Sequence, residues 1–159
     1  MAIAPSRRMA VVARTPVCPE PRGLACDAAT DQVQVACVGG ELVTFAAATG
    51  KETRRLRLDR DLRDVLNDGK GLRISRFRSA ELLSIDASGS ITSRAKAHSS
   101  VDLAARPFDA AVAWRTIGLP GGGLATLHQT GLAAPVPAAF SGAAYYADPC
   151  SITFVVAAP

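Results

Sequence analysis

The sequence predicts an all-β fold, and two observations carry this prediction. Short segments with largely alternating apolar positions follow one another, separated by turn residues, which is typical of a β-meander. The segments also repeat after about 40 residues, and four short strands at such a period are typical of a β-propeller blade. The chain of 159 residues holds about two copies and part of a third. We therefore expect a partial β-propeller of antiparallel four-stranded blades.

The segment 1–15 is interpreted as an N-terminal edge segment, with one edge strand expected around Met9 to Ala13. The first copy follows. Its four predicted strands, in order, are PRGLACD, QVQVACVGG, ELVTFAA and ETRRLRL, which start at Pro21. The intervening DAATD and AATGK segments and a Gly-Gly pair are turn formers.

The second copy matches the first piece by piece. Leu24 is matched by Val65 at an offset of 41 residues, and Glu41 is matched by Glu81 at an offset of 40, so the copies differ only by small changes in the turns. LRDVLND thus corresponds to PRGLACD, and ELLSIDASG to ELVTFAAATG. The segment 16–94 is therefore interpreted as two propeller blades.

The third copy is incomplete. The segment 95–110 is interpreted as a linker, and 111–159 as part of a blade followed by an irregular C-terminal segment. Strands are expected over 113–119 and 124–129, a loop rich in Ala, Pro and Gly over 130–150, and a final strand over 151–157. Propellers close with about four to eight blades. The chain is thus interpreted first as a piece of a longer polypeptide, next as a protomer that completes a ring by oligomerising, and last as a small β-sandwich.

Charge and hydropathy limit the partners. The net charge of +4 comes from 18 basic and 14 acidic residues. The arginines alternate with acids in LDRDLRD, and no aromatic stacking platform accompanies them, so the pattern favours a solvated surface over a nucleic-acid site. No apolar run is long enough to cross a bilayer. The remaining candidate partners are further propeller blades or another protein.

The four cysteines fit neither a metal nor a haem site. Cys18, Cys26, Cys37 and Cys150 form no CxxC pair, no CxxCH segment and no Cys/His set at zinc spacing. Cys18 precedes the first strand and Cys37 ends the second, so both are expected on one side of the first blade. We prefer a disulfide between them to two free thiols, provided that the chain is exported. Cys150 has no evident partner.

The first copy, PRGLACDAATDQVQVACVGGELVTFAAATGKETRRLRL, resembles repeats of YVTN-type, lactonase-like β-propellers. The second and third copies resemble the propeller region of exported myxobacterial proteins that also carry a c-type cytochrome or di-haem peroxidase-like module. The resemblance implies a periplasmic or extracellular parent protein. The N-terminal residues show no convincing export signal, so the chain is either cytoplasmic or preceded by further sequence. Haem belongs only to a larger parent, because this chain has no CxxCH.

Strand direction alternates within a blade, so the loops after the second and fourth strands should share one rim. The residues expected there form what we call the arginine rim, with His128 beside it from the third copy. Its members are Arg60, Arg63, Arg76 and Arg78. Arginine offers paired donors to carboxylate or phosphate, so an anionic ligand or partner is one interpretation. The alternative is that these arginines pair with Asp59, Asp61 and Asp64 and fix the loops.

No catalytic motif is present. The residues of a Ser-His-Asp triad occur, but in no nucleophile-elbow context, and Gly121 to Gly123 lack the lysine and helix of a phosphate loop. We therefore expect a non-enzymatic scaffold or binding module within a larger exported protein. The alternative is part of a cytochrome- or peroxidase-linked enzyme, or of a lactonase-like hydrolase, with its catalytic residues outside this chain.

Overall fold

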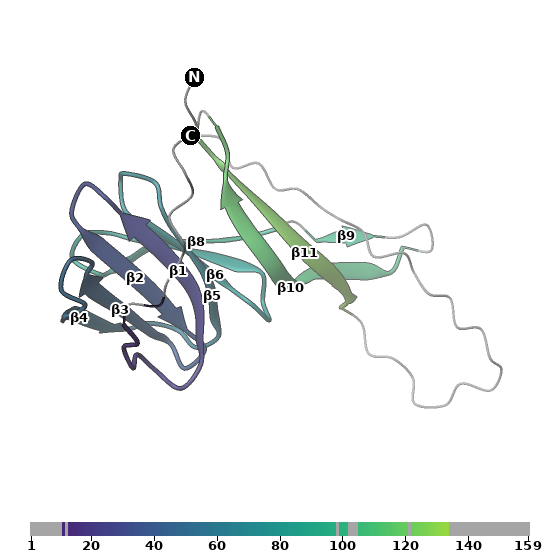
Figure 1. The fold of residues 1–159 in the computed structure, drawn as a ribbon. Coiled ribbons are helices and arrows are strands. Elements are labelled where there is room, and N and C mark those ends of the chain that lie inside the picture. The colour runs from purple at the N-terminus through teal and green to yellow at the C-terminus, as the bar shows by residue number, and fades with distance from the viewer. Residues whose placement is uncertain (1–10, 12, 98, 102–104, 121, 134–159) are drawn as a thin grey trace, which may run out of the picture.

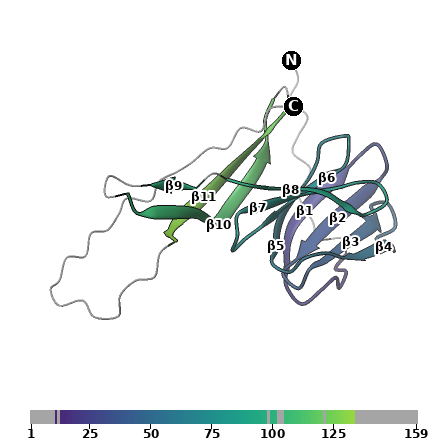
Figure 2. The same cartoon turned by 180° about the vertical axis from the view of Figure 1, so that it is seen from behind.

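The computed structural model describes residues 11, 13–97, 99–101, 105–120 and 122–133. These residues form strands and turns and no helix, which confirms the predicted all-β class. The strands make three antiparallel sheets that follow one another in chain order (Figures 1 and 2). Each sheet is open, because none of them closes on itself.

The first sheet is the predicted meander. It contains β1 (Pro21–Asp27), β2 (Gln32–Cys37), β3 (Glu41–Ala46) and β4 (Glu52–Arg57), paired in that order. Two glycines take the left-handed conformation that the tight turns need, Gly40 at φ 105° and Gly50 at φ 66°. The turn residues in the sequence therefore set the strand ends.

The second sheet repeats this plan. It contains β5 (Leu62–Asn67), β6 (Leu72–Arg76), β7 (Glu81–Ile85) and β8 (Ile91–Lys96), again in chain order. In the β5–β6 turn, the backbone N–H groups of Lys70 and Gly71 donate to Asp68 Oδ1 at 2.9 and 3.0 Å. An Asp-led turn thus satisfies the backbone where the strand pairing ends.

The third sheet departs from the predicted division of the chain. It is a long hairpin of β10 (Pro107–Gly118) and β11 (Leu124–Leu132), with the short β9 (Ser100–Val101) beside β10. The predicted linker over 95–110 is wrong in part, because β8 continues to Lys96 and β9 and the start of β10 lie inside it. Backbone pairing makes part of the predicted linker a strand, because Phe108 pairs with Ser100 of β9 on one side and with Leu132 of β11 on the other.

Two predicted end strands are not seen in the described residues. Val11 and Ala13 form no strand, and the rest of the predicted strand around 9–13 lies outside the described residues. The start of the predicted loop over 130–150 is wrong, because β11 extends to Leu132, and residues 134–150 of that loop lie outside the described residues. The predicted strand over 151–157 lies outside the described residues.

The main core lies between the first two sheets. Buried side chains from both sheets form one cluster, namely Ala36, Leu42, Leu62, Val65, Ile74, Leu83 and Ile85. Because side chains alternate between the two sides of a strand, each sheet turns one apolar side toward the other. Burial of this shared surface stabilises the pair of sheets.

The step from one sheet to the next is marked by the same backbone bond. The Asp61 N–H donates to Val38 O, and the Ala113 N–H donates to Phe77 O, both at 2.6 Å. Val38 and Phe77 each follow the second strand of a sheet, whereas Asp61 precedes β5 and Ala113 lies in β10. The internal repeat therefore corresponds to a repeated junction between neighbouring sheets.

The other side of the first sheet packs against the segment that precedes β1. Val17 and Cys18 pack against a second cluster formed by Val35, Cys37, Val43 and Phe45. A disulfide joins Cys18 to Cys37, the pair preferred on sequence grounds, with the two Cα atoms 6.5 Å apart. The segment before β1 is thus bound covalently to the end of β2.

Candidate functional site

The arginine rim lies where the β4–β5 and β6–β7 connections meet. The Phe77 N–H donates to Asp61 O at 2.9 Å, and the Arg78 N–H donates to Asp61 Oδ2 at 2.7 Å. Asp61 takes a positive φ of 72°, which turns its backbone toward the other loop. The structure therefore brings these two loops together, as the rim argument expects.

Arg76 belongs to an ion-pair network. Its guanidinium lies 2.7 Å from Glu81 Oε2 and 3.4 Å from Asp59 Oδ2. Arg94 contacts the same two carboxylates at 3.2 and 2.5 Å. The hydrogen bond from Arg94 and the charges of both arginines lower the pKa of Asp59. For Arg76 the geometry favours the interpretation that it fixes the loops.

The other members of the arginine rim have looser surroundings. Arg63 lies over the Phe77 ring, 5.2 Å from its centroid, and its Nε donates to Trp114 O at 3.4 Å. Arg60 is exposed, and its carbonyl oxygen accepts from Arg76 Nε at 3.1 Å. Arg63 and Arg78 line a hollow of about 120 Å³ together with Glu20, Arg22 and Asp61. This volume admits little more than a single carboxylate or phosphate group.

His128 does not join the arginine rim. Its side chain is buried, with 2% of its surface exposed, and Nδ1 lies 3.0 Å from Gln129 O. It lines a cavity of about 60 Å³ between the second sheet and β11. The expectation that His128 contributes to the rim is corrected, because β11 continues to Leu132 and carries this residue within the strand.

Asp64 is also absent from the arginine rim. It is buried on β5, where Oδ2 accepts the Thr116 N–H at 2.6 Å and Oδ1 lies 3.6 Å from the Arg115 guanidinium. This carboxylate therefore joins the second sheet to β10, and it is not available to an external ligand.

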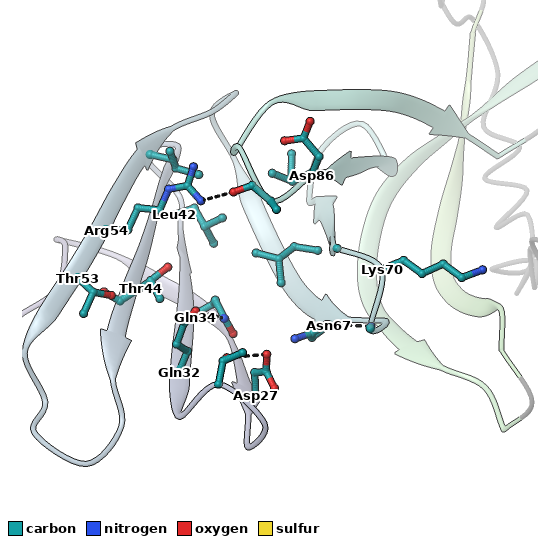
Figure 3. Close-up of a pocket in the computed structure, with 17 residues that line it drawn as sticks. Asp27, Gln32, Gln34, Leu42, Thr44, Thr53, Arg54, Asn67, Lys70 and Asp86 are labelled. Carbon is teal, nitrogen blue, oxygen red and sulfur yellow. Dashed lines mark hydrogen bonds between the residues drawn. The ribbon is translucent and has the colours of Figure 1, made fainter.

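A larger pocket opens between the first two sheets, at the end opposite the arginine rim. Its volume is about 530 Å³, within the range that holds small ligands. The β1–β2, β5–β6 and β7–β8 connections border it, and β4 closes one side (Figure 3). The polar side chains on its walls are Asp27, Thr30, Gln32, Gln34, Thr44, Thr53, Arg54, Asn67, Lys70 and Asp86.

Gln34 is the most informative residue of this inter-sheet pocket. Its side chain is buried, with 4% of its surface exposed, and Nε2 donates to Gln32 Oε1 at 3.4 Å. Its Oε1 atom is buried and has no hydrogen-bond partner among the described residues. Leaving a buried acceptor unpaired costs about 1–3 kcal/mol. A donor that enters the pocket would recover this cost.

Three charged groups of the inter-sheet pocket, Arg54, Asp27 and Asp86, already have partners in the protein. Arg54 Nη1 donates to Ala87 O at 2.8 Å, and Nη2 donates to Ser88 O. Asp27 accepts from the Thr30 hydroxyl at 2.7 Å and from the Ala29 N–H at 3.0 Å, and the Thr30 bond leads the causes that lower the Asp27 pKa.

Asp86 is held in the same way as Asp27. It accepts from the Ser88 hydroxyl at 2.6 Å, and that bond leads the causes that lower its pKa. Asp27, Arg54 and Asp86 thus shape the loops that border the pocket, and the neutral groups provide most of its binding capacity.

The inter-sheet pocket was not predicted from the sequence. The predicted site consisted of arginines in loops, whereas the pocket depends on the inward side of β2, where Gln32 and Gln34 interrupt the apolar alternation. Polar residues at inward strand positions were the available signal, because a buried amide needs a partner.

Among the residues that the structure describes, no group of three or more His, Cys, Asp or Glu side chains could hold a metal ion. None of them belongs to a helix that is long and apolar enough to span a membrane. No protein-family model matches this sequence, and no curated protein is similar to it.

Proposed function

We propose that this chain is a non-catalytic binding module made of propeller-type blades, and that it holds a small polar ligand in the inter-sheet pocket. The observation that carries the proposal is the buried and unpartnered Gln34 Oε1 within a pocket of about 530 Å³. A buried polar atom without a partner requires a specific explanation, and a ligand donor supplies one.

The propeller-type arrangement is supported by the repeated junction. Val38 and Phe77, which both follow the second strand of their sheet, each accept a bond from the next sheet, from the N–H of Asp61 and of Ala113 respectively. A stack that adds one sheet per repeat is the construction principle of propellers. Further blades from a longer chain or from a partner would continue the series.

The mechanism is presentation by a rigid support. Two sheets share an apolar core, and their turns hold polar groups at the mouth of the inter-sheet pocket. Ligand groups would therefore meet positions that are already ordered, which lowers the entropic cost of binding. Export of the parent protein is part of this proposal, because the disulfide between Cys18 and Cys37 persists in an oxidising compartment.

The test is a variant that fills the inter-sheet pocket. Thr53 lines it from β4, and its hydroxyl donates to Thr44 O at 3.2 Å. Thr92 occupies the same position of the second sheet, donates to Ser84 O at 3.3 Å, and does not line the pocket. Thr92→Trp is thus a matched control for Thr53→Trp.

We expect ligand-observed NMR with a mixed panel of saccharides, amino acids, nucleosides and small carboxylates to give binders. Their signals should be lost in Thr53→Trp and kept in Thr92→Trp. If no panel member binds, or if Thr53→Trp leaves every binder unaffected, the inter-sheet pocket is not a ligand site and the proposed function is wrong.

A further inference from the structure

We infer that the ligand of the inter-sheet pocket is a neutral polyhydroxylated molecule of the saccharide class. This inference rests on the proposed function and specifies its ligand. Its basis is the kind of group that the pocket walls leave free, which Figure 3 shows for the labelled side chains.

The charges of the inter-sheet pocket favour a neutral ligand. Its acids are Asp27 and Asp86, and its bases are Arg54 and Lys70, so the formal charges cancel. Arg54 is engaged by the carbonyl groups of Ala87 and Ser88, and Lys70 extends away from the other labelled side chains (Figure 3). Proteins usually recognise a phosphate or carboxylate group with an arginine guanidinium that donates two hydrogen bonds, and no free guanidinium of the described residues lines this pocket.

The neutral groups favour hydroxyl groups as the ligand's polar atoms. Gln34 Oε1 is a buried acceptor that needs a donor. The Asn67 amide oxygen accepts the Gly69 N–H at 2.9 Å and its NH2 group interacts with the Asp27 carboxylate, which leaves one of its two N–H groups as a donor. The Thr44 hydroxyl group can donate and accept, and the Thr53 hydroxyl group, which donates to Thr44 O, can still accept. A hydroxyl group of a ligand can serve each of these roles, whereas a purely cationic or anionic group serves only one.

The rest of the wall is apolar. Four large aliphatic side chains line the pocket alongside the polar groups, namely Leu42, Leu56, Leu72 and Ile85. A saccharide ring combines C–H faces with a rim of hydroxyl groups, so it can cover apolar and polar wall at the same time. Sites of this kind combine apolar lining with a few placed polar groups.

The experiment compares matched neutral and charged sugars on the whole chain. The probes are glucose, galactose, mannose and maltose, with glucose 6-phosphate, gluconate and glucosamine as charged analogues. We expect dissociation constants of the neutral binders to be insensitive to added NaCl. We also expect the charged analogues to bind at least about tenfold more weakly, because ionised groups lose hydration without gaining a partner.

Gln34→Leu tests the residue that carries the inference. Loss of the Oε1 acceptor should weaken binding of the neutral sugar by about tenfold, which corresponds to one hydrogen bond to a buried group. Gln129→Leu is the control, because it removes the same kind of side chain from β11, which does not line the pocket. Thermal melting establishes that both variants are folded.

The outcomes separate the two levels of the proposal. If Thr53→Trp blocks a panel member while neutral sugars do not bind, or while charged analogues bind as tightly, the saccharide class is wrong and the pocket remains a ligand site. Unchanged sugar affinity in Gln34→Leu also overturns the inference. If Thr53→Trp blocks no ligand at all, the proposed function fails, and the saccharide assignment fails with it.

Discussion

In both four-stranded sheets, the segment before the first strand is bound to the end of the second strand, but by different chemistry. In the first sheet, Pro21 lies opposite Cys37, and Cys37 is bound to Cys18 by a disulfide. In the second sheet, Leu62 lies opposite Arg76, and Arg76 pairs with Asp59 at 3.4 Å. Because Pro21 corresponds to Leu62, Cys18 corresponds to Asp59 and Cys37 to Arg76. A covalent bond in one copy thus stands where an ion pair stands in the other.

The inward positions differ as well. Gly23 of β1 lies so close to β5 that a Cβ atom there would be 2.3 Å from Arg63 O. The corresponding residue of β5 is Asp64, whose carboxylate reaches the backbone of β10. The residue at this repeat position thus matches the distance to the next sheet. Gly23 permits close contact between β1 and β5, and the Asp64 side chain spans the wider gap between β5 and β10.

Gly23→Val should have the largest effect. The added side chain would collide with the rigid β5 backbone. Overpacking of this kind typically costs about 1–3 kcal/mol, and a clash with backbone belongs to the upper end of that range or above it. Urea unfolding should show a large loss of the free energy of unfolding. Gly118→Val is a control, because a Cβ there meets no atom within 4 Å. Equal stability losses in the two variants would contradict the close contact between Gly23 and the β5 backbone.

Removal of the disulfide should have the next largest effect. Cys18→Ser with Cys37→Ser opens a link across 19 residues of sequence, which should cost about 3 kcal/mol in the chain-entropy model. The measurement is thermal unfolding under oxidising conditions. Cys26→Ser is the control, since Cys26 is an exposed free cysteine. A double variant as stable as the parent would show that the disulfide adds nothing to the first sheet.

Asp64→Ala should destabilise the junction with β10. It leaves the buried Thr116 N–H without its acceptor, at a cost of about 2 kcal/mol. Asp64→Asn keeps a side-chain oxygen that can accept this bond, so it should cost less. Hydrogen exchange at the Thr116 amide gives a direct measurement. If that amide exchanges equally slowly in Asp64→Ala, the carboxylate does not hold β10.

The ion pair of the second sheet should contribute least. Arg76→Met should cost less than about 1 kcal/mol, because the paired side chains are partly exposed. Urea unfolding measures this loss, and a loss larger than that of Asp64→Ala would contradict the ranking.

The Asp59 carboxylate predicts a pH dependence, because the hydrogen bond from Arg94 and the charges of Arg94 and Arg76 favour its ionised form. The pKa of Asp59 lies below its ordinary value of 3.8 in the folded protein, so its contribution is present above that value. It is lost as the pH falls through the lower folded pKa. Subtracting the acid unfolding curve of Asp59→Asn isolates this contribution from those of other acids. Parallel curves for the two proteins would contradict it.

Much of the fold could be predicted from the sequence because its signals are local. Alternating apolar residues and turn formers predict the strands of the first two sheets, and the repeat predicts that their loops meet in register. The third sheet was predicted less well, because the pairing of Phe108 with Ser100 and Leu132 carries weak turn and alternation signals.

The candidate site was predicted incompletely. Arg76 and Asp59 were expected as neighbours at one end, but Gln34 was not expected in a pocket at the other. The partners of Gln34 depend on where the second sheet, formed by a later part of the chain, presents its turns. The two glutamines of β2 mark polar inward positions, but the residues around them do not say which groups of the second sheet will face them.

By itself, the sequence determined the strand periodicity, the positions of the turns and the repeat, and it favoured the pair of Cys18 and Cys37, because these depend on backbone preference and spacing along the chain. Only the tertiary structure decided the distance between neighbouring sheets. That distance buries His128 and Asp64, makes glycine necessary at position 23, and leaves the Gln34 oxygen without a partner in the inter-sheet pocket among the described residues. The physical reason is that packing between sheets depends on the volumes of residues far apart in sequence.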